Sequence, residues 1–269
     1  TEQHIYPNMN SNEQKSLKAK ITYVYTGRLE YRGRLLKQIS TLQEAGHDCR
    51  LMYGAWGETP LQKEDFNFPI EVIPTPRKFG ALALFFNQLK FGYMAGHRIA
   101  DSDATHAVCF SLESLLAGAV AKRRKPELKL IFDSNELHIE SFVSRNKRNL
   151  WAPIQKFCIR YCDLIMHAET NRIEYFKKHH DPTDRPQFLL ENFPFFTPKR
   201  NLSEAPPVPP IRVLYVGMLG FDRYTRELID IFRELAPDFS LDLVGPMEPK
   251  LRAEIDRVFR DNPAANVKF

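Results

Sequence analysis

The stretch Ile-Arg-Val-Leu-Tyr-Val-Gly, residues 211 to 217, decides the fold of this chain of 269 residues. It is a short apolar run that ends in glycine, which is typical of a strand buried in a parallel sheet. Apolar residues at helical spacing follow between 228 and 235, and residues 241–244 form a second apolar run that ends at Gly245. A strand, a helix and a second strand in this order predict one βαβ unit.

An earlier unit of the same kind begins at Ile21, and its apolar runs also alternate with segments of helical periodicity. The predicted strands of this part are residues 21–25, 49–53, 70–73, 106–110, 128–132, 164–167 and 188–190. This alternation predicts an α/β fold with two Rossmann-like domains, each built on a doubly wound parallel sheet. The domains would face each other across a cleft, where ligands of such folds bind.

The composition along the chain predicts the domain boundaries. Residues 1–19 are polar and predict a loose tail, and residues 20–195 form the first domain. The proline-rich residues 196–210 predict a linker. The second domain, residues 211–269, is too short to bury a doubly wound sheet by itself. We therefore expect an incomplete C-terminal domain. We favour truncation of the chain as the reason, and completion by a partner is the alternative.

The overall composition predicts a globular protein, because 43% hydrophobic residues can supply two cores. The formal charge of +5 favours anionic partners, which include phosphorylated small molecules, acidic membranes and nucleic acid. We expect no nucleic-acid binding, because the aromatic residues stand in core-like runs and are not interleaved with lysine and arginine.

The N-terminal residues lack a secretion signal, and no apolar run is long enough to cross a bilayer. We therefore expect a cytoplasmic protein that is soluble or bound to a membrane surface. Cys158 and Cys162 would share one apolar helix face. We favour core packing for them over a metal site, because no histidine or cysteine pair with zinc-like spacing stands nearby.

Residues 78–98 combine many leucine and aromatic residues with Lys90 and Arg98. Two interpretations fit this pattern. Apolar residues occupy most of the circumference of the predicted helix, which favours a core helix. The basic residues also allow an interfacial helix that touches lipid, and then a peripheral contact with a membrane and a lipid-linked acceptor would follow.

The loop after the first strand, residues 27–34, is the first candidate binding site. It leads to a helix N-terminus, whose free N–H groups favour an anion, and Arg28 and Arg34 add positive charge. Gly27 and Gly33 would let a substrate approach the backbone closely. The loop lacks the Gly-x-Gly-x-x-Gly dinucleotide fingerprint, and its glycines could also serve only a tight turn.

The loop of residues 133–138 is the second candidate, because it follows a buried strand and carries several polar groups. Asp133, Asn135, Glu136 and His138 could hydrogen-bond a hydroxylated substrate or accept its proton. Capping of the next helix is the alternative. We favour the functional role, because a helix needs one cap and this loop offers several polar groups.

The loop of residues 217–226 occupies the corresponding place in the second domain. Arg223 could neutralise a diphosphate leaving group, which needs fixed positive charge where negative charge develops. A solvated start of the next helix is the alternative. No Asp-x-Asp pair stands in a suitable loop, so we expect no metal ion.

These features together resemble glycosyltransferase family 4 and its relatives of GT-B fold. The segments that carry the resemblance are residues 34–49, 131–137, 161–165, Asn192, 214–219 and 243–245. Two departures stand out: Asn135 where many members carry histidine, and Met218 where many carry arginine. The glutamate-rich segment that grips the donor in the family does not occur before the sequence ends.

The resemblance implies transfer of a sugar from a nucleoside diphosphate sugar to an acceptor, with retention of the anomeric configuration and no cofactor. The acceptor would be a glycan or a lipid-linked glycan. From the residues and the resemblance together, the candidate catalytic residues are Asn135, Glu136 and His138. The candidate substrate-binding residues are Gly27, Arg28, Gly33, Asp133 and Asn192, and the candidate donor-binding residues are Gly217, Met218 and Arg223. The alternative is a non-catalytic binding or scaffold protein of the same fold that a partner completes.

Overall fold

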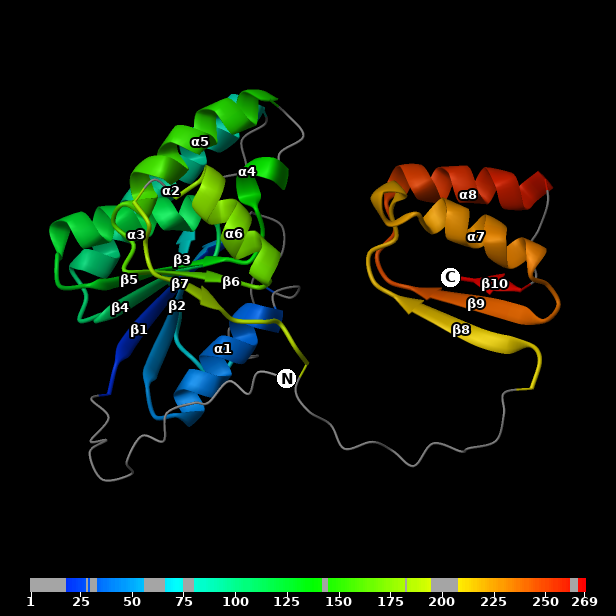
Figure 1. Ribbon diagram of the computed structural model, residues 1–269, viewed down its shortest axis with the longest axis horizontal. Coiled ribbons are helices and arrows are strands. Elements are labelled where there is room, and N and C mark those ends of the chain that lie inside the picture. The colour runs from blue at the N-terminus through cyan, green and yellow to red at the C-terminus, as the bar shows by residue number, and fades with distance from the viewer. Residues whose placement is uncertain are drawn as a thin grey trace. The chain divides into compact units, whose positions relative to one another are not determined.

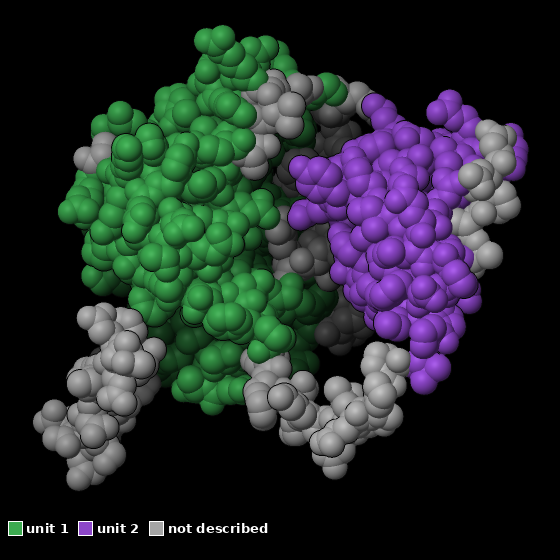
Figure 2. All heavy atoms as spheres, turned by 45° about the vertical axis from the view of Figure 1, so that its right-hand side comes forward, with its two compact units in different colours: residues 1–194 green, residues 195–269 purple. Residues whose placement is uncertain are grey.

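A computed structural model shows two compact units, Thr1–Pro194 and Phe195–Phe269 (Figures 1 and 2). The structure describes residues 18–27, 29, 33–55, 66–74, 80–141, 145–181, 183–194, 208–261 and 266–269. Most of the predicted tail and of the predicted linker therefore lies outside the described residues.

Among the described residues of the first unit, seven parallel strands form one sheet in the order β3-β2-β1-β4-β5-β6-β7. The strands are β1 (Lys20–Thr26), β2 (Asp48–Ala55), β3 (Ile70–Pro74), β4 (His106–Cys109), β5 (Lys129–Ser134), β6 (Leu164–His167) and β7 (Gln187–Leu189). The order reverses beside β1, as in a doubly wound sheet. The predicted α/β class and the predicted strands of this unit are confirmed.

Two predicted strand ends in this sheet are wrong, and the first is that of β2, which runs to Ala55 instead of residue 53. β5 extends two residues beyond the predicted strand 128–132, because Asp133 pairs with Met166 and Ser134 pairs with His167 of β6. A strand in the middle of a sheet continues as long as its neighbour offers backbone partners. The loop after β5 therefore begins at Asn135.

The helices of the first unit cover both faces of this sheet. They are α1 (Gly33–Glu44), α2 (Ala81–Ala100), α3 (Leu112–Arg124), α4 (His138–Ser141), α5 (Arg145–Ile159) and α6 (Thr170–His179). Figure 1 shows α1 on one face and α2, α3 and α5 on the other. Tyr23, Leu35 and Ile39 belong to the core on the side of α1, and Phe91 and Phe132 belong to the core on the opposite side.

The prediction of a core helix at residues 78–98 holds for one face of α2. Phe91, Ala95 and Ile99 are buried, whereas Phe86 and Tyr93 are each 59% exposed. Residues 78 and 79 lie outside the described part of the chain. Within the described residues, none of the helices combines the length and the apolar content that a membrane span needs.

The predicted burial of the cysteine pair is confirmed, but the predicted shared helix face is wrong, because α5 ends at Ile159 and Cys162 lies beyond it. Cys158 and Cys162 are buried in the core beneath α5. Burial raises the pKa of the Cys158 thiol to about 12 and also raises the pKa of Cys162. Both side chains therefore behave as small apolar residues at neutral pH.

The second unit contains a smaller parallel sheet in the order β10-β9-β8. Its elements are β8 (Ile211–Val216), the short 3₁₀ helix η3 (Phe221–Arg223), α7 (Thr225–Glu234), β9 (Phe239–Val244), α8 (Pro249–Asp261) and β10 (Val267–Lys268). Figure 1 shows α7 and α8 on the same face of the sheet. Ile229, Phe232, Leu241, Leu251 and Ile255 form the core between these helices and the strands.

The opposite face of this sheet exposes apolar side chains beside the ion pair between Arg212 and Asp242. Leu214 and Val216 of β8 are 62% and 69% exposed, and Val244 of β9 is 52% exposed. The expectation that residues 211–217 form a fully buried strand is therefore wrong for one of its two faces. Parallel sheets are normally covered on both faces, but the described helices of this unit cover only one.

Two glycines allow the backbone to run close together after β8 and β9. The N–H of Gly217 donates to the Val244 carbonyl at 3.0 Å, and the N–H of Leu219 donates to the Pro246 carbonyl at 2.9 Å. A Cβ atom on Gly245 would lie 1.8 Å from the carbonyl oxygen of Gly217, and Gly245 has a φ of 148°. Only glycine fits this position.

We predict that Gly245→Ala destabilises the second unit by at least about 2 kcal/mol, through backbone strain and steric overlap. Hydrogen exchange of peptides from residues 211–261, followed by mass spectrometry, measures this loss. Gly33→Ala is the matched control, because a Cβ atom there would meet nothing within 4 Å. Unchanged exchange protection in Gly245→Ala would contradict the proposed contact.

Candidate functional site

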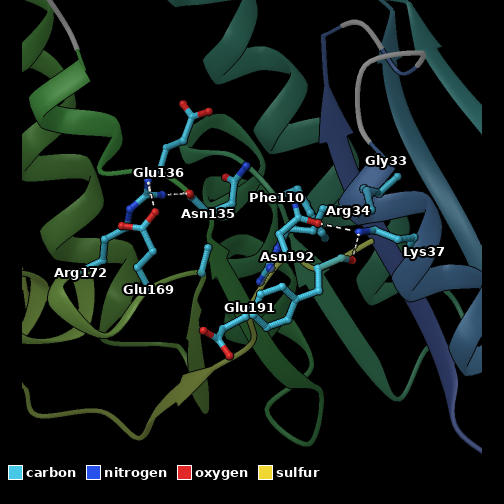
Figure 3. Close-up of a pocket in the computed structure, with 13 residues that line it drawn as sticks. Gly33, Arg34, Lys37, Phe110, Asn135, Glu136, Glu169, Arg172, Glu191 and Asn192 are labelled. Carbon is cyan, nitrogen blue, oxygen red and sulfur yellow. Dashed lines mark hydrogen bonds and ion pairs between the residues drawn. The ribbon is translucent and has the colours of Figure 1, made fainter. Parts of the chain in front are cut away.

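A cavity of about 570 Å³ lies in the first unit, at the carboxyl ends of its strands (Figure 3). Its walls come from the first turn of α1 and from the segments that follow β4, β5, β6 and β7. The lining residues are Gly33, Arg34, Leu35, Lys37, Phe110, Asn135, Glu136, Ala168, Glu169, Arg172, Glu191, Asn192 and Phe193. This is the edge at which parallel α/β sheets bind ligands.

A buried ion pair forms the base of this site. Arg34 is 8% exposed and Asp133 is 0% exposed, and the Nε of Arg34 donates to Oδ2 of Asp133 at 3.0 Å. The Nη2 of Arg34 donates to Oδ1 of the same carboxylate at 3.1 Å, and the Nε2 of Gln38 donates to Oδ2 at 2.7 Å. The remaining guanidinium nitrogen donates to the carbonyl of Leu190. Two charges can be buried at low cost only when they are paired in this way.

The next turn of α1 holds the segment that follows β7. The Nζ of Lys37 donates to Oδ1 of Asn192 at 2.8 Å and to the carbonyl of Phe193 at 2.6 Å. Figure 3 shows Lys37 and Asn192 directed toward each other at one side of the cavity. These bonds fix the segment that leads out of the first unit.

The opposite side of the cavity is formed by the loop after β5 and the start of α6. Arg172 donates to the backbone carbonyl of Asn135, and its Nη2 lies 3.3 Å from Oε1 of Glu169. Within the described residues, the side-chain Oδ1 of Asn135 is buried without a hydrogen-bond partner. Glu136 is exposed beside it. A ligand with a hydroxyl group could therefore donate a hydrogen bond to Asn135.

Positive and negative side chains are balanced around the cavity. The charged residues among its lining are Arg34, Lys37, Arg172, Glu136, Glu169 and Glu191. These are three cations and three carboxylates, and the buried Asp133 adds one more negative charge. The N-termini of α1 and α6 contribute only partial positive charge. The site therefore suits a ligand with many hydroxyl groups better than a ligand with several phosphate charges.

The structure brings together four of the predicted site residues in this cavity. Gly33, Asn135, Glu136 and Asn192 line it, from three separate parts of the chain. Asp133 lies beneath the cavity and does not line it; its carboxylate is engaged by Arg34 and Gln38. Arg28, which is also predicted to bind substrate, lies outside the described residues.

Gly27 and His138 are not among the lining residues. The carbonyl of Gly27 accepts a hydrogen bond from the Tyr53 hydroxyl, and its φ of 119° suits glycine at a turn. This geometry favours the turn interpretation over substrate contact. His138 is the first residue of α4, and its ring centroid lies 6.3 Å from that of Phe132. The catalytic role of His138 stays a prediction.

The predicted donor residues lie at the carboxyl end of β8 in the second unit. Met218 is 61% exposed, and its carbonyl accepts a hydrogen bond from the Tyr215 hydroxyl at 3.2 Å. Arg223 belongs to η3, and its Nε lies 3.5 Å from a carboxylate oxygen of Asp222. The Arg223 side chain is 59% exposed, so an incoming anion could displace Asp222. The N–H of Gly217 is already bonded to Val244.

Several lining residues were missed from the sequence, notably Lys37, Phe110, Glu169, Arg172 and Glu191. A signal existed for three of them, because Phe110, Glu169 and Glu191 each lie at or just after the end of a predicted strand. Ligands of parallel α/β sheets bind at the carboxyl ends of the strands, and this rule points to all three of these residues. Lys37 and Arg172 lie inside helices, and no sequence pattern marks them.

His167 at the end of β6 is held by a second buried network. Its Nε2 meets Oε1 of Gln187, whose Nε2 donates to Asp181 at 2.9 Å. The amide of Gln187 is thereby oriented, and the proton of the neutral imidazole lies on Nε2. His167 is 0% exposed, and burial lowers its pKa. The residue directly precedes Ala168 of the cavity wall, so this network positions the wall.

No protein-family model matches the sequence, and no curated protein matches it. Among solved structures, the chain is similar to the lipopolysaccharide outer core galactosyltransferase WaaB in its apo form, with a TM-score of 0.64 and 13% identity. The similarity covers 93% of this chain and 67% of that chain. The chain has the GT-B fold.

Two further solved structures are similar to this chain at equally low sequence identity. Anabaena HepE in complex with UDP and glucose has a TM-score of 0.60 and 15% identity, and the match covers 93% of this chain and 68% of that chain. A UDP-N-acetylglucosamine 2-epimerase has a TM-score of 0.57 and 12% identity, with 94% and 68% covered. Because the chain is similar in structure both to a galactosyltransferase and to an epimerase, function must be argued from the site.

We predict that Arg34→Met and Asp133→Leu each destabilise the first unit by about 3–5 kcal/mol, because each leaves a buried charge without its partner. The double variant should lose clearly less than the sum of the two. Urea unfolding monitored by tryptophan fluorescence measures the three values. Asp103→Asn is the control for an exposed pair and should have little effect, because water screens Asp103 from Lys20 and Arg50. Additive losses would show that the pair is not coupled.

We predict that His167 makes the first unit sensitive to acid. Because burial lowers the pKa of His167 in the folded state, the unfolded chain binds its proton first as the pH falls below about 6.5. Stability should therefore fall as the pH drops through about 6.5, and it should fall less in His167→Gln. The exposed His179→Gln is the control. Parallel pH profiles for wild type and His167→Gln would contradict the assignment.

Proposed function

We propose that this protein is a glycosyltransferase that moves a sugar from a nucleoside diphosphate sugar to an acceptor. The observation that carries the proposal is a cavity of about 570 Å³ with balanced charge and many hydrogen-bonding groups, at the carboxyl edge of the first sheet in a chain of GT-B fold. This volume is in the range of sites for small ligands. The cavity is assigned to the acceptor.

The acceptor is a glycan or a lipid-linked glycan, whose hydroxyl groups match the polar lining of the cavity. The Oδ1 of Asn135 accepts a hydrogen bond from an acceptor hydroxyl, and Asn192 lies at the opposite wall. Glu136 is the exposed carboxylate beside Asn135, and it orients the attacking hydroxyl or takes its proton.

The donor is assigned to the loop after β8 in the second unit. Gly217 and Met218 form the backbone beside which the donor lies, and Arg223 pairs with the diphosphate as negative charge develops on it. In the reaction, the bond between the anomeric carbon and the diphosphate oxygen breaks, and a bond to the acceptor oxygen forms. The diphosphate leaves with the electron pair. We propose that the anomeric configuration is retained and that no cofactor takes part.

The second candidate is a non-catalytic binding or scaffold protein that a partner completes. The exposed apolar face of the second sheet, with Leu214, Val216 and Val244, favours this candidate, because another polypeptide segment could cover it. Such a protein would bind a nucleotide sugar without turnover.

Calorimetric titration with UDP, GDP and their common sugar conjugates tests the proposal, followed by an assay for sugar transfer to glycan and lipid-linked acceptors. The titration uses these 269 residues and, where the gene encodes more, the longer chain.

We predict that Arg223→Ala weakens nucleotide binding by about tenfold, because it removes a charge-assisted contact. Glu136→Gln should lower the transfer rate by about a hundredfold or more and leave nucleotide binding unchanged.

The exposed Glu174→Gln in α6 is the matched control and should change neither quantity. Nucleotide binding without transfer would favour the scaffold candidate. Conversion of the donor sugar in the absence of acceptor would point to an epimerase, and absence of nucleotide binding in every form would contradict both.

A further inference from the structure

α2 keeps an apolar stripe in water although its other face packs into the core. Leu82, Phe86 and Tyr93 are 64%, 59% and 59% exposed. Their spacing of four and seven residues places them on one face of the helix. Large apolar side chains gathered in this way mark contact sites for other molecules.

α5 carries a second stripe of the same kind. Leu150 and Phe157 are 44% and 46% exposed, and they are two helical turns apart. Phe85 of α2 packs edge-on against Trp151 of α5, with ring centroids 5.3 Å apart, so the two helices meet at this point. Figure 1 shows both helices on the same face of the sheet.

The charges on these helices are all positive. Neither α2 nor α5 contains an aspartate or a glutamate in its sequence. The exposed Lys90 stands between Phe86 and Tyr93 along α2, and the exposed Lys156 is next to Phe157 in α5. We define the α2–α5 face by seven of the exposed residues of these helices: Leu82, Phe86, Lys90, Tyr93, Leu150, Lys156 and Phe157.

This combination matches the boundary between the headgroups and the acyl chains of an anionic bilayer. Apolar side chains enter the acyl boundary, aromatic side chains are favoured at the interface, and lysines pair with the headgroups. A nucleic acid would use the same charges, but Leu82 and Leu150 have no aromatic face on which a base could stack. The leucines therefore favour lipid.

We propose that the α2–α5 face docks on a membrane surface that contains anionic lipid. The connection to the cavity is short along the chain, because α4 and α5 are the next two helices after Glu136 of the cavity wall. The Nη2 of Arg148 in α5 also reaches the carbonyl of Glu140 in α4 at 3.4 Å. Docking would thus present the cavity to acceptors held in the membrane. This last point rests on the proposed function, whereas the docking itself does not.

Flotation with vesicles tests the docking without donor or acceptor. Vesicles of phosphatidylcholine alone are compared with an equal mixture of phosphatidylcholine and phosphatidylglycerol. We expect the chain to float with the mixed vesicles, and added salt to weaken this binding. Absence of flotation, or equal flotation with both vesicles, would overturn the proposal.

Two double variants separate the apolar and the electrostatic contributions. Leu82→Ser with Phe86→Ser should lower binding by about tenfold or more, and Lys90→Gln with Lys156→Gln should lower it by roughly fivefold for each charge. Phe85 is left intact because it packs against Trp151. Since all four side chains are exposed, the variants should keep the circular dichroism and thermal unfolding of the wild type.

The matched controls are Phe188→Ser, which removes an exposed aromatic residue of β7, and Lys177→Gln with Lys178→Gln in α6. These variants should float like the wild type. If the folded variant with Leu82→Ser and Phe86→Ser floats as well as the wild type, the proposed docking face is wrong. Tighter binding to an oligonucleotide than to the mixed vesicles would replace lipid with nucleic acid as the partner.

The two proposals can fail separately. Vesicle binding without any nucleotide binding would remove the proposed function and keep the docking face. Sugar transfer to a soluble acceptor by a chain that does not bind vesicles would remove the docking face and keep the proposed function.

Discussion

The buried ion pair between Arg34 and Asp133 is the interaction on which the cavity depends. It joins the first turn of α1 to the end of β5, and through the carbonyl of Leu190 it also joins both to the segment after β7. In the interior, either charge alone would cost several kcal/mol, so the three elements cannot separate without a large loss. Lys37, one turn further along α1, extends the same attachment to Asn192. A single helix thus positions two walls of the site.

The same pair also decides what kind of ligand the cavity accepts. The N-terminus of α1 could have bound an anion, and Arg34 could have supplied its charge. Because Asp133 neutralises Arg34, and Glu169 lies against Arg172, two of the three cations in the wall are already paired with carboxylates. The partial charges of the helix ends alone attract a phosphate only weakly. Hydroxyl groups, which both donate and accept hydrogen bonds, fit the remaining lining better.

The sequence predicts the strands well because each strand of the first unit is a compact apolar run between polar connections. It also predicts that Asn135 and Glu136 line the site, because they follow a strand in the middle of the sheet, where ligands bind. It could not predict the role of Lys37, which depends on Asn192, 155 residues away along the chain. For Gly27 the sequence allowed two roles, and only the bond from the Tyr53 hydroxyl to its carbonyl favours one. Pairings between distant segments leave no local pattern.

The GT-B fold alone does not separate transfer from epimerisation, but the place of the cavity gives a physical reason to prefer transfer. Every residue that lines the cavity belongs to the first unit, so this unit can form a ligand site without the residues after β8. A reaction of a nucleotide sugar by itself needs one site for the diphosphate and its sugar. A second site, of ordinary size for a small ligand and with little net charge, is what a second substrate requires. The exposed Arg223 after β8 belongs to the second unit and could exchange Asp222 for a diphosphate, so the two units carry candidate groups for two different substrates.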